Sequence, residues 1–156
     1  MRVLGGIAMR AISTSSHWVE RLATPWVRWL ALLGLCAAYL QGGLQKLWGY
    51  DAAVAETAHF GMTPAGPITV AVILLELGAS LAILSGKGRW LGALLLAVFT
   101  LAATFIANRF WSVPEAERFG VTNAFFEHLG LVGGFLLVAW YDLRERAMLA
   151  ATSPHP

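Results

Sequence analysis

The sequence predicts an all-α integral membrane protein, a four-helix bundle with both termini in the cytoplasm (N-in/C-in). Of its 156 residues, 58% are hydrophobic and only 13% are charged, which is too apolar for an ordinary soluble domain. The apolar residues gather in four runs, each close to the roughly 20 residues that cross a bilayer core about 30 Å thick. This length leaves room for four spans and no separate soluble domain.

The four expected spans are joined by short connections. Pro67 suits the first turn of a helix, where its missing N–H is not needed, and Gly86-Lys87-Gly88 predicts a tight turn that joins spans two and three in a hairpin. Small residues at four-residue spacing, such as Gly130 and Gly134, favour close packing of the spans. The expected spans are residues 27–47, 67–85, 89–110 and 124–141. The expected division is an interfacial or cytoplasmic segment 1–25, a membrane domain 26–142 and a cytoplasmic tail 143–156.

The basic residues predict the orientation. Eight of the 11 lie before span one or in its first turn, between spans two and three, or after span four, whereas Lys46, Arg109 and Arg118 lie on the other side. Because basic residues are enriched on the cytoplasmic side, both termini are expected there. Tryptophan and tyrosine residues near the ends of the spans fit the two membrane interfaces. The expected location is the inner membrane of a bacterium, with the lipid bilayer as the main partner.

Glu76 lies in the otherwise uncharged run 68–84, where a carboxylate normally faces protein or a wet cavity and marks a functional site. It follows Pro67 by nine residues and therefore lies roughly 14 Å deep. Other polar residues stand near the same, outer ends of the spans. Glu76 and His128 are the candidates for proton exchange, since a histidine titrates near neutral pH. The candidate binding residues are Gln41, Gln45, Lys46, Asn108, Asn123 and Glu127.

Structural roles are open for several of these residues. Glu76 could serve as a buried hydrogen-bonding partner for Gln45 or Lys46, and Lys46 could reach the interface as an anchor. Gln41 and Gln45 could form hydrogen bonds between helices.

The composition also excludes some classes of function. The formal net charge of +2 is small and the basic residues are scattered, which gives no support to nucleic-acid binding. Cys36 is the single cysteine, so the chain has no intramolecular disulfide and no thiolate metal cluster. No residue spacing suggests a metal site. Redox chemistry would require a bound cofactor, substrate or partner.

Several segments together resemble the bacterial DoxX family of four-helix inner-membrane proteins, over residues 29–140. They are Gly43-Leu-Gln-Lys-Leu47, Leu75-Glu-Leu-Gly78, the turn up to Trp90, Phe99-Thr-Leu-x-Ala-Thr104 and Asn123-Ala-Phe-Phe-Glu-His-Leu-Gly-Leu-Val-Gly-Gly134. The family's conserved lysine and glutamate fall on Lys46 and Glu76. Many members carry a Lys-Asn pair where this chain has Glu127 and His128. Because relatives include subunits of thiosulfate:quinone oxidoreductases and proteins linked to oxidative-stress defence, the resemblance implies redox chemistry near the quinone pool.

Two functions of different class follow. The leading hypothesis is a membrane protein that binds a small apolar redox molecule, with a quinone as the candidate cofactor, in a pocket open to the periplasm. Glu76 would relay a proton while Lys46, Gln45 and His128 orient polar oxygens. The alternative is a non-catalytic subunit or scaffold that recruits a redox enzyme through its cytoplasmic ends. A small permease is a third reading, and it would require an oligomer.

Overall fold

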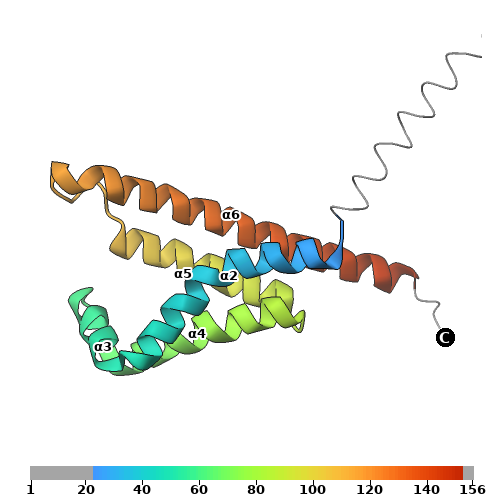
Figure 1. Cartoon of the computed structure of the whole chain (residues 1–156), viewed down its shortest axis with the longest axis horizontal. Helices are drawn as coiled ribbons and strands as arrows, with labels where there is room; N and C mark the ends of the chain where they lie inside the picture. The colour runs from blue at the N-terminus through green and yellow to red at the C-terminus, as the bar shows by residue number, and fades with distance from the viewer. Residues whose placement is uncertain (1–22, 153–156) are drawn as a thin grey trace, which may run out of the picture. The chain divides into compact units, whose positions relative to one another are not determined.

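The structure is a computed structural model that describes residues 23–152. The expected all-helical fold is confirmed, because the described residues form helices and no strand. The helices are α2 (Pro25–Trp48), α3 (Tyr50–His59), α4 (Ala65–Ser85), α5 (Arg89–Ala107) and α6 (Glu115–Thr152) (Figure 1). Within this range, α2, α4, α5 and α6 are long and apolar enough to cross a membrane. The expected segment 1–25 lies mostly outside the described residues, as do the last four residues of the expected tail.

Helix α2 crosses a boundary between two compact units, of which the first ends at Gly34 and the second begins at Leu35. In the first unit, the side-chain oxygen of Thr24 accepts a hydrogen bond from the backbone N–H of Val27 at 3.4 Å. Thr24 therefore caps the start of α2, and Pro25 occupies the first helical position, where no N–H is needed. All that follows concerns the second unit.

Helices α4 and α5 form the expected hairpin. Gly86 and Gly88 both adopt positive φ, at 79° and 74°, a conformation that glycine tolerates best. Beyond the turn, α5 approaches α4 so closely that a Cβ at Gly92 would lie 2.7 Å from the carbonyl oxygen of Ala79. We call this end of the second unit the hairpin end.

The remaining contacts join α2 and α6 to this hairpin. A Cβ at Gly43 of α2 would lie 2.8 Å from two side-chain carbons of Leu77 in α4. Tyr39 of α2 meets Phe135 of α6 edge to face, with ring centroids 5.3 Å apart. Gly130, by contrast, has no atom within 4 Å of the position of an added Cβ. The helices thus approach at particular glycines and not along every stripe of small residues.

Two helices differ from the expected loops. Helix α3 occupies much of the connection between spans one and two, and it packs on α4 through a buried hydrogen bond of 2.8 Å between Thr57 and Thr69. Helix α6 has 38 residues where 124–141 were expected as a span. It begins directly after Pro114, with Glu115 and Glu117 in its first turn. Acidic side chains at this position interact favourably with the helix dipole. We call the end of the unit that contains α3 the α3 end.

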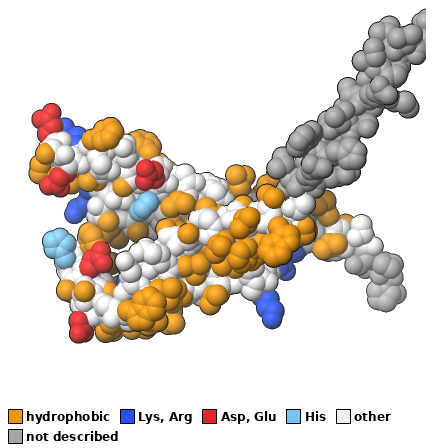
Figure 2. Space-filling model, in the orientation of Figure 1, with side chains coloured by type: hydrophobic (Ala, Val, Ile, Leu, Met, Phe, Trp, Pro, Cys, Tyr) orange, Lys and Arg blue, Asp and Glu red, His pale blue; other side chains and the backbone are white. Residues whose placement is uncertain are grey.

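The outer surface of the helices is apolar. Leu74 and Leu81 of α4 and Val98 of α5 are each more than 60% exposed, and hydrophobic side chains cover much of the visible surface between the two ends (Figure 2). Such faces are stable against lipid chains but costly in water. The helices therefore contact the lipid bilayer with these faces.

Candidate functional site

Glu76 faces the protein interior and is only 5% exposed. The side-chain nitrogen of Lys46, from the last turn of α2, lies 3.1 Å from each of its two carboxylate oxygens. An added Cβ at Gly42 would lie 3.4 Å from this nitrogen and 3.8 Å from one of the oxygens. Gly42 thus lies in van der Waals range of both charged groups. The result is an ion pair inside a membrane span, where charges are normally paired.

The Lys46–Glu76 pair lies at the margin of the protein interior. The side chain of Lys46 is 27% exposed and that of Glu76 is 7% exposed. One face of the pair is therefore accessible from outside the bundle, whereas the carboxylate is enclosed. Such an arrangement can pass a proton between an accessible group and a buried one.

A second set of polar groups lies one helical turn from Glu76, toward the hairpin end. Tyr39 and Thr100 share a buried hydrogen bond of 2.5 Å, and the Thr100 hydroxyl also reaches the carbonyl oxygen of Leu96 at 2.6 Å. Ser80, four residues after Glu76, has a fully buried hydroxyl that finds no hydrogen-bond partner of suitable geometry. Nothing in the sequence marks Tyr39 as a site residue, because a tyrosine in an apolar run has no distinctive spacing.

His128 belongs to a separate cluster between α5 and α6. Its ring nitrogen Nδ1 lies 2.6 Å from the hydroxyl of Thr104 and 3.1 Å from the side-chain nitrogen of Asn108. An amide NH₂ group only donates, so Nδ1 accepts, and the neutral ring then carries its proton on Nε2. In the ring of His128, Nδ1 is thus the acceptor held by its two neighbours, and the N–H at Nε2 can donate to another group.

Hydrogen bonds join four of the predicted site residues in two pairs. Lys46 pairs with Glu76, and Asn108 joins His128. Among the described residues, no hydrogen bond joins Glu76 to Gln45 or to His128. The other predicted residues, which are Gln41, Gln45, Asn123 and Glu127, have exposed side chains. At the α3 end the surface is notched between α3 and the ends of α5 and α6 (Figure 2).

A group of aromatic rings is centred on Phe125, three residues before His128 in α6. Phe125, next to it on α6, is buried and meets four other rings at centroid distances between 5.3 and 6.1 Å. These rings belong to Phe105, Phe110, Trp111 and Phe126. The aromatic cluster holds the α5–α6 connection and provides an apolar wall beside the polar group.

Asp142, which the sequence analysis left out, is a buried acid at the hairpin end. It is 5% exposed. Its two carboxylate oxygens lie 3.6 Å from Nη1 of Arg89 and 2.8 Å from Nε of Arg146. The four-residue spacing of Asp142 and Arg146 is a sequence signal for a pair on one helix face, but the contact with Arg89 depends on the fold. Within residues 23–152 no group of three or more His, Cys, Asp or Glu side chains could hold a metal ion.

Comparison with known proteins identifies the family. A sequence model described as DoxX matches residues 29–109, which is more than half of the 156 residues. The matched segment contains both Lys46 and Glu76, whereas His128 lies beyond it. No curated protein and no solved structure matched the chain. The chain belongs to the DoxX family, and its four apolar helices make it a multi-pass membrane protein.

Proposed function

We propose that this protein binds a small apolar redox molecule, with a quinone as the best candidate, at the α3 end of the bundle. The Lys46–Glu76 pair is the observation that carries the proposal. A carboxylate inside a span is costly and is usually retained for function, and this one has a partially exposed partner that can connect it to the membrane surface.

The chemistry of a quinone matches these groups. Its reduction to a quinol takes up two electrons and two protons, so a site that supports it needs a group that exchanges protons beside an apolar slot. Glu76 is that group, and Lys46 is its ion-pair partner. In this proposal the two electrons come from a redox enzyme that acts as a partner.

The second cluster has a binding role in this proposal. The Nε2–H of His128 donates a hydrogen bond to a carbonyl oxygen of the ligand, while Thr104 and Asn108 fix the ring. Apolar rings such as Phe125 provide the wall against which a planar ligand lies. The exposed Gln41, Gln45, Asn123 and Glu127 line the approach to the site.

The distribution of charge supports an orientation with both termini in the cytoplasm of a bacterial cell. The hairpin end carries the basic residues Lys87, Arg89, Arg144 and Arg146, and basic residues favour the cytoplasmic side. The α3 end has three basic residues against six acidic ones, which are Asp51, Glu56, Glu76, Glu115, Glu117 and Glu127. The α3 end, and with it the proposed site, then faces the periplasm.

A second candidate function is a scaffold that recruits a redox enzyme, and the length of α6 favours it. The 38 residues of this helix extend about 57 Å at 1.5 Å per residue, which is well beyond a hydrocarbon core of about 30 Å. Its last turns carry the exposed side chains of Leu143, Met148 and Leu149. Met148 and Leu149 follow the basic residues Arg144 and Arg146, and this last part of α6 is the candidate docking helix.

Binding of a short-chain ubiquinone tests the first candidate. The protein in phosphatidylcholine nanodiscs is titrated with the quinone, and tryptophan fluorescence is followed. We expect saturable quenching that weakens at least about tenfold in Glu76→Leu, which corresponds to about 1.4 kcal/mol. Glu117→Gln is the matched control, since Glu117 is an exposed acid in the first turn of α6. Quenching no greater than in empty nanodiscs contradicts the proposal.

Capture of a partner tests the scaffold. The chain truncated after Tyr141 and the whole chain are compared in pull-downs from membranes of the source cell. A redox enzyme that is captured by the whole chain and lost on truncation supports the scaffold. Quinone binding that persists unchanged in the truncated chain favours the first candidate.

A further inference from the structure

The hairpin end contains a charged cluster that the proposed quinone site does not use. Asp142 is almost fully buried, yet it lies near the end of a span and beside the α4–α5 turn. A buried carboxylate requires hydrogen bonds or counter-charges. Asp142 receives both from two arginines on different helices.

The geometry fixes both guanidinium groups. Arg89, at the start of α5, donates from Nε to the carbonyl oxygen of Ile83 at 3.0 Å, and its Nη1 lies 3.6 Å from one oxygen of Asp142. Arg146 donates from Nε to the other oxygen at 2.8 Å. One carboxylate thus positions two cations, and the three side chains together keep a net charge of +1.

Arg146 retains the means to bind a further group. Its side chain is 51% exposed, and Nε is the nitrogen that contacts Asp142. A guanidinium has five N–H donors in a rigid plane, which suits the oxygens of a phosphate. Arg146 is therefore oriented by Asp142 while its outer face remains accessible.

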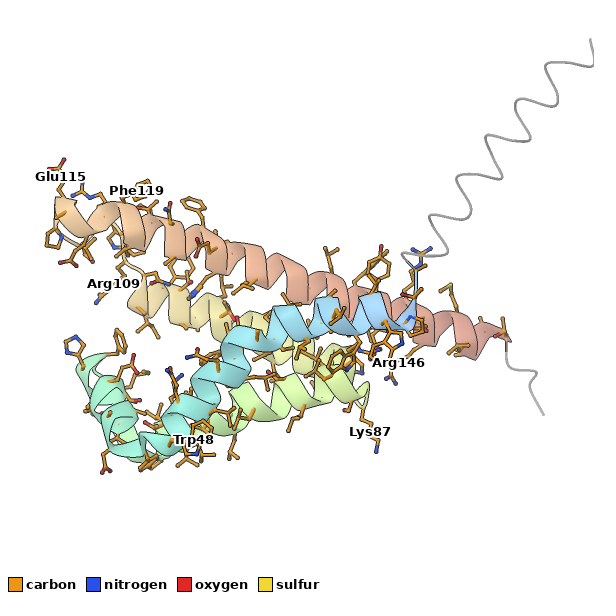
Figure 3. All side chains as sticks on the ribbon, viewed as in Figure 1. Trp48, Lys87, Arg109, Glu115, Phe119 and Arg146 are labelled. Carbon is orange, nitrogen blue, oxygen red and sulfur yellow. The ribbon has the colours of Figure 1, made fainter. Side chains whose placement is uncertain are left out.

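Two more cations and an aromatic residue lie at the same end. Lys87 is exposed in the α4–α5 turn, and Figure 3 shows it at the same end as Arg146, opposite Arg109 and Glu115. Arg144 lies over the ring of Trp140 at 5.2 Å. Tryptophan is typical of the level of lipid headgroups. This end carries four basic residues and two acidic ones, Asp142 and Glu145.

We propose that this cluster binds the phosphate of an anionic phospholipid headgroup, with Arg146 and Lys87 as the contacting residues and Asp142 as the residue that positions Arg146. Basic groups between helices at the level of the headgroups are suited to such lipids. This site is separate from the proposed quinone site, and it would make the protein select phosphatidylglycerol or another anionic lipid from its surroundings.

Retention of lipid tests the proposal. The protein is purified from bilayers of equal phosphatidylcholine and phosphatidylglycerol, and the retained lipids are counted by native mass spectrometry. We expect enrichment of phosphatidylglycerol that falls about fivefold in Lys87→Gln and in Arg146→Gln, as expected from the attraction of one basic residue near the membrane surface. Arg118→Gln, at the opposite end, is the matched control. Equal retention of the two lipids by the unaltered protein overturns the proposal.

Asp142→Asn separates a built site from simple attraction of charge. This change makes the cluster more positive by one charge but removes the group that orients Arg146. The proposal predicts weaker enrichment, whereas attraction by net charge predicts stronger enrichment and would overturn it. If this variant does not fold, the enrichment of phosphatidylglycerol in Arg146→Gln and in Lys87→Gln still tests the lipid site. Inorganic phosphate, added to the protein in phosphatidylcholine alone, distinguishes the sources: a rise in Tm as large as that caused by phosphatidylglycerol would contradict a lipid site.

Discussion

Lys46 and Glu76 are 30 residues apart in the chain, and the ammonium of the first lies 3.1 Å from both carboxylate oxygens of the second. Their contact joins the end of α2 to the middle of α4. It also removes the need for any other counter-charge at Glu76. The properties of this pair decide both the stability of the bundle at the α3 end and the chemistry that the protein can perform there.

Breaking the pair from one side should be more harmful than removing it. Lys46→Met leaves the carboxylate of Glu76 enclosed without a counter-charge. We expect it to lower the free energy of unfolding by about 2 kcal/mol, less than for a fully buried pair because Lys46 is partially exposed. In Lys46→Met/Glu76→Leu the loss should be smaller than in Lys46→Met alone. The free energy of unfolding of the unaltered protein, the two single variants and the double variant forms a double-mutant cycle. It is measured by unfolding in detergent, followed by circular dichroism. Strictly additive effects would show that the two side chains do not interact.

In the neutral form of His128 the proton should lie on Nε2. This follows from the position of Nδ1, which lies within hydrogen-bond distance of the Thr104 hydroxyl and of the Asn108 NH₂ group, because an NH₂ group can only donate. Nitrogen NMR of the protein labelled at histidine distinguishes the two tautomers, and the signals that disappear in His128→Asn belong to His128. We expect the Nε2–H form in the unaltered protein and a mixture of forms in Thr104→Val. An Nδ1–H form in the unaltered protein would contradict this geometry.

Glycines should differ in their tolerance of alanine according to what lies next to them. Gly92→Ala would place a methyl group against the backbone oxygen of Ala79, which cannot move aside, and we expect a loss of about 2 kcal/mol. Gly43→Ala would meet the flexible side chain of Leu77 and should cost less. Gly130→Ala meets nothing within 4 Å and is the matched control. The Tm values of the three variants give the order, and equal values for Gly92→Ala and Gly130→Ala would contradict the packing.

Both termini should report the cytoplasm. Reporter fusions after Ser153 are expected to be active only for a cytoplasmic reporter, and fusions within residues 51–63, which include most of α3, only for a periplasmic one. The reason is the concentration of basic residues at the hairpin end. The reverse pattern would place the Lys46–Glu76 pair on the cytoplasmic side, and the proposed quinone site would then draw its protons from there.

Much of the fold follows from hydropathy and turn residues. The four spans and the hairpin could be predicted because a bilayer requires long apolar helices and because Gly86 and Gly88 suit a tight turn. Helix α3 was missed because its ten residues, with a mixed polar and apolar sequence, carry no apolar face strong enough to stand out. The full length of α6 was missed because polar residues at both ends look like loops when only apolar runs are counted.

The candidate site was predicted in part. Glu76 stood out because a charge in an apolar run is rare, and Lys46 was named as one of two structural partners. The contacts of His128 with Thr104 and Asn108 could not be predicted, since hydropathy places residues at a depth but does not say which helices are neighbours. For the same reason, the contact between Arg89 and Asp142 had no signal in the sequence.

Infrared spectroscopy of the Glu76 carboxyl group tests the central claim most directly. Difference spectra are recorded in nanodiscs when a short-chain quinone is added to the unaltered protein and to Glu76→Gln, with Glu127→Gln as the control for a nearby exposed acid on α6. The account predicts a change in a carboxyl band on binding of the quinone that persists in Glu127→Gln and is absent in Glu76→Gln. A saturable quinone signal with an identical carboxyl spectrum in all three proteins would show that Glu76 takes no part, and would contradict the account.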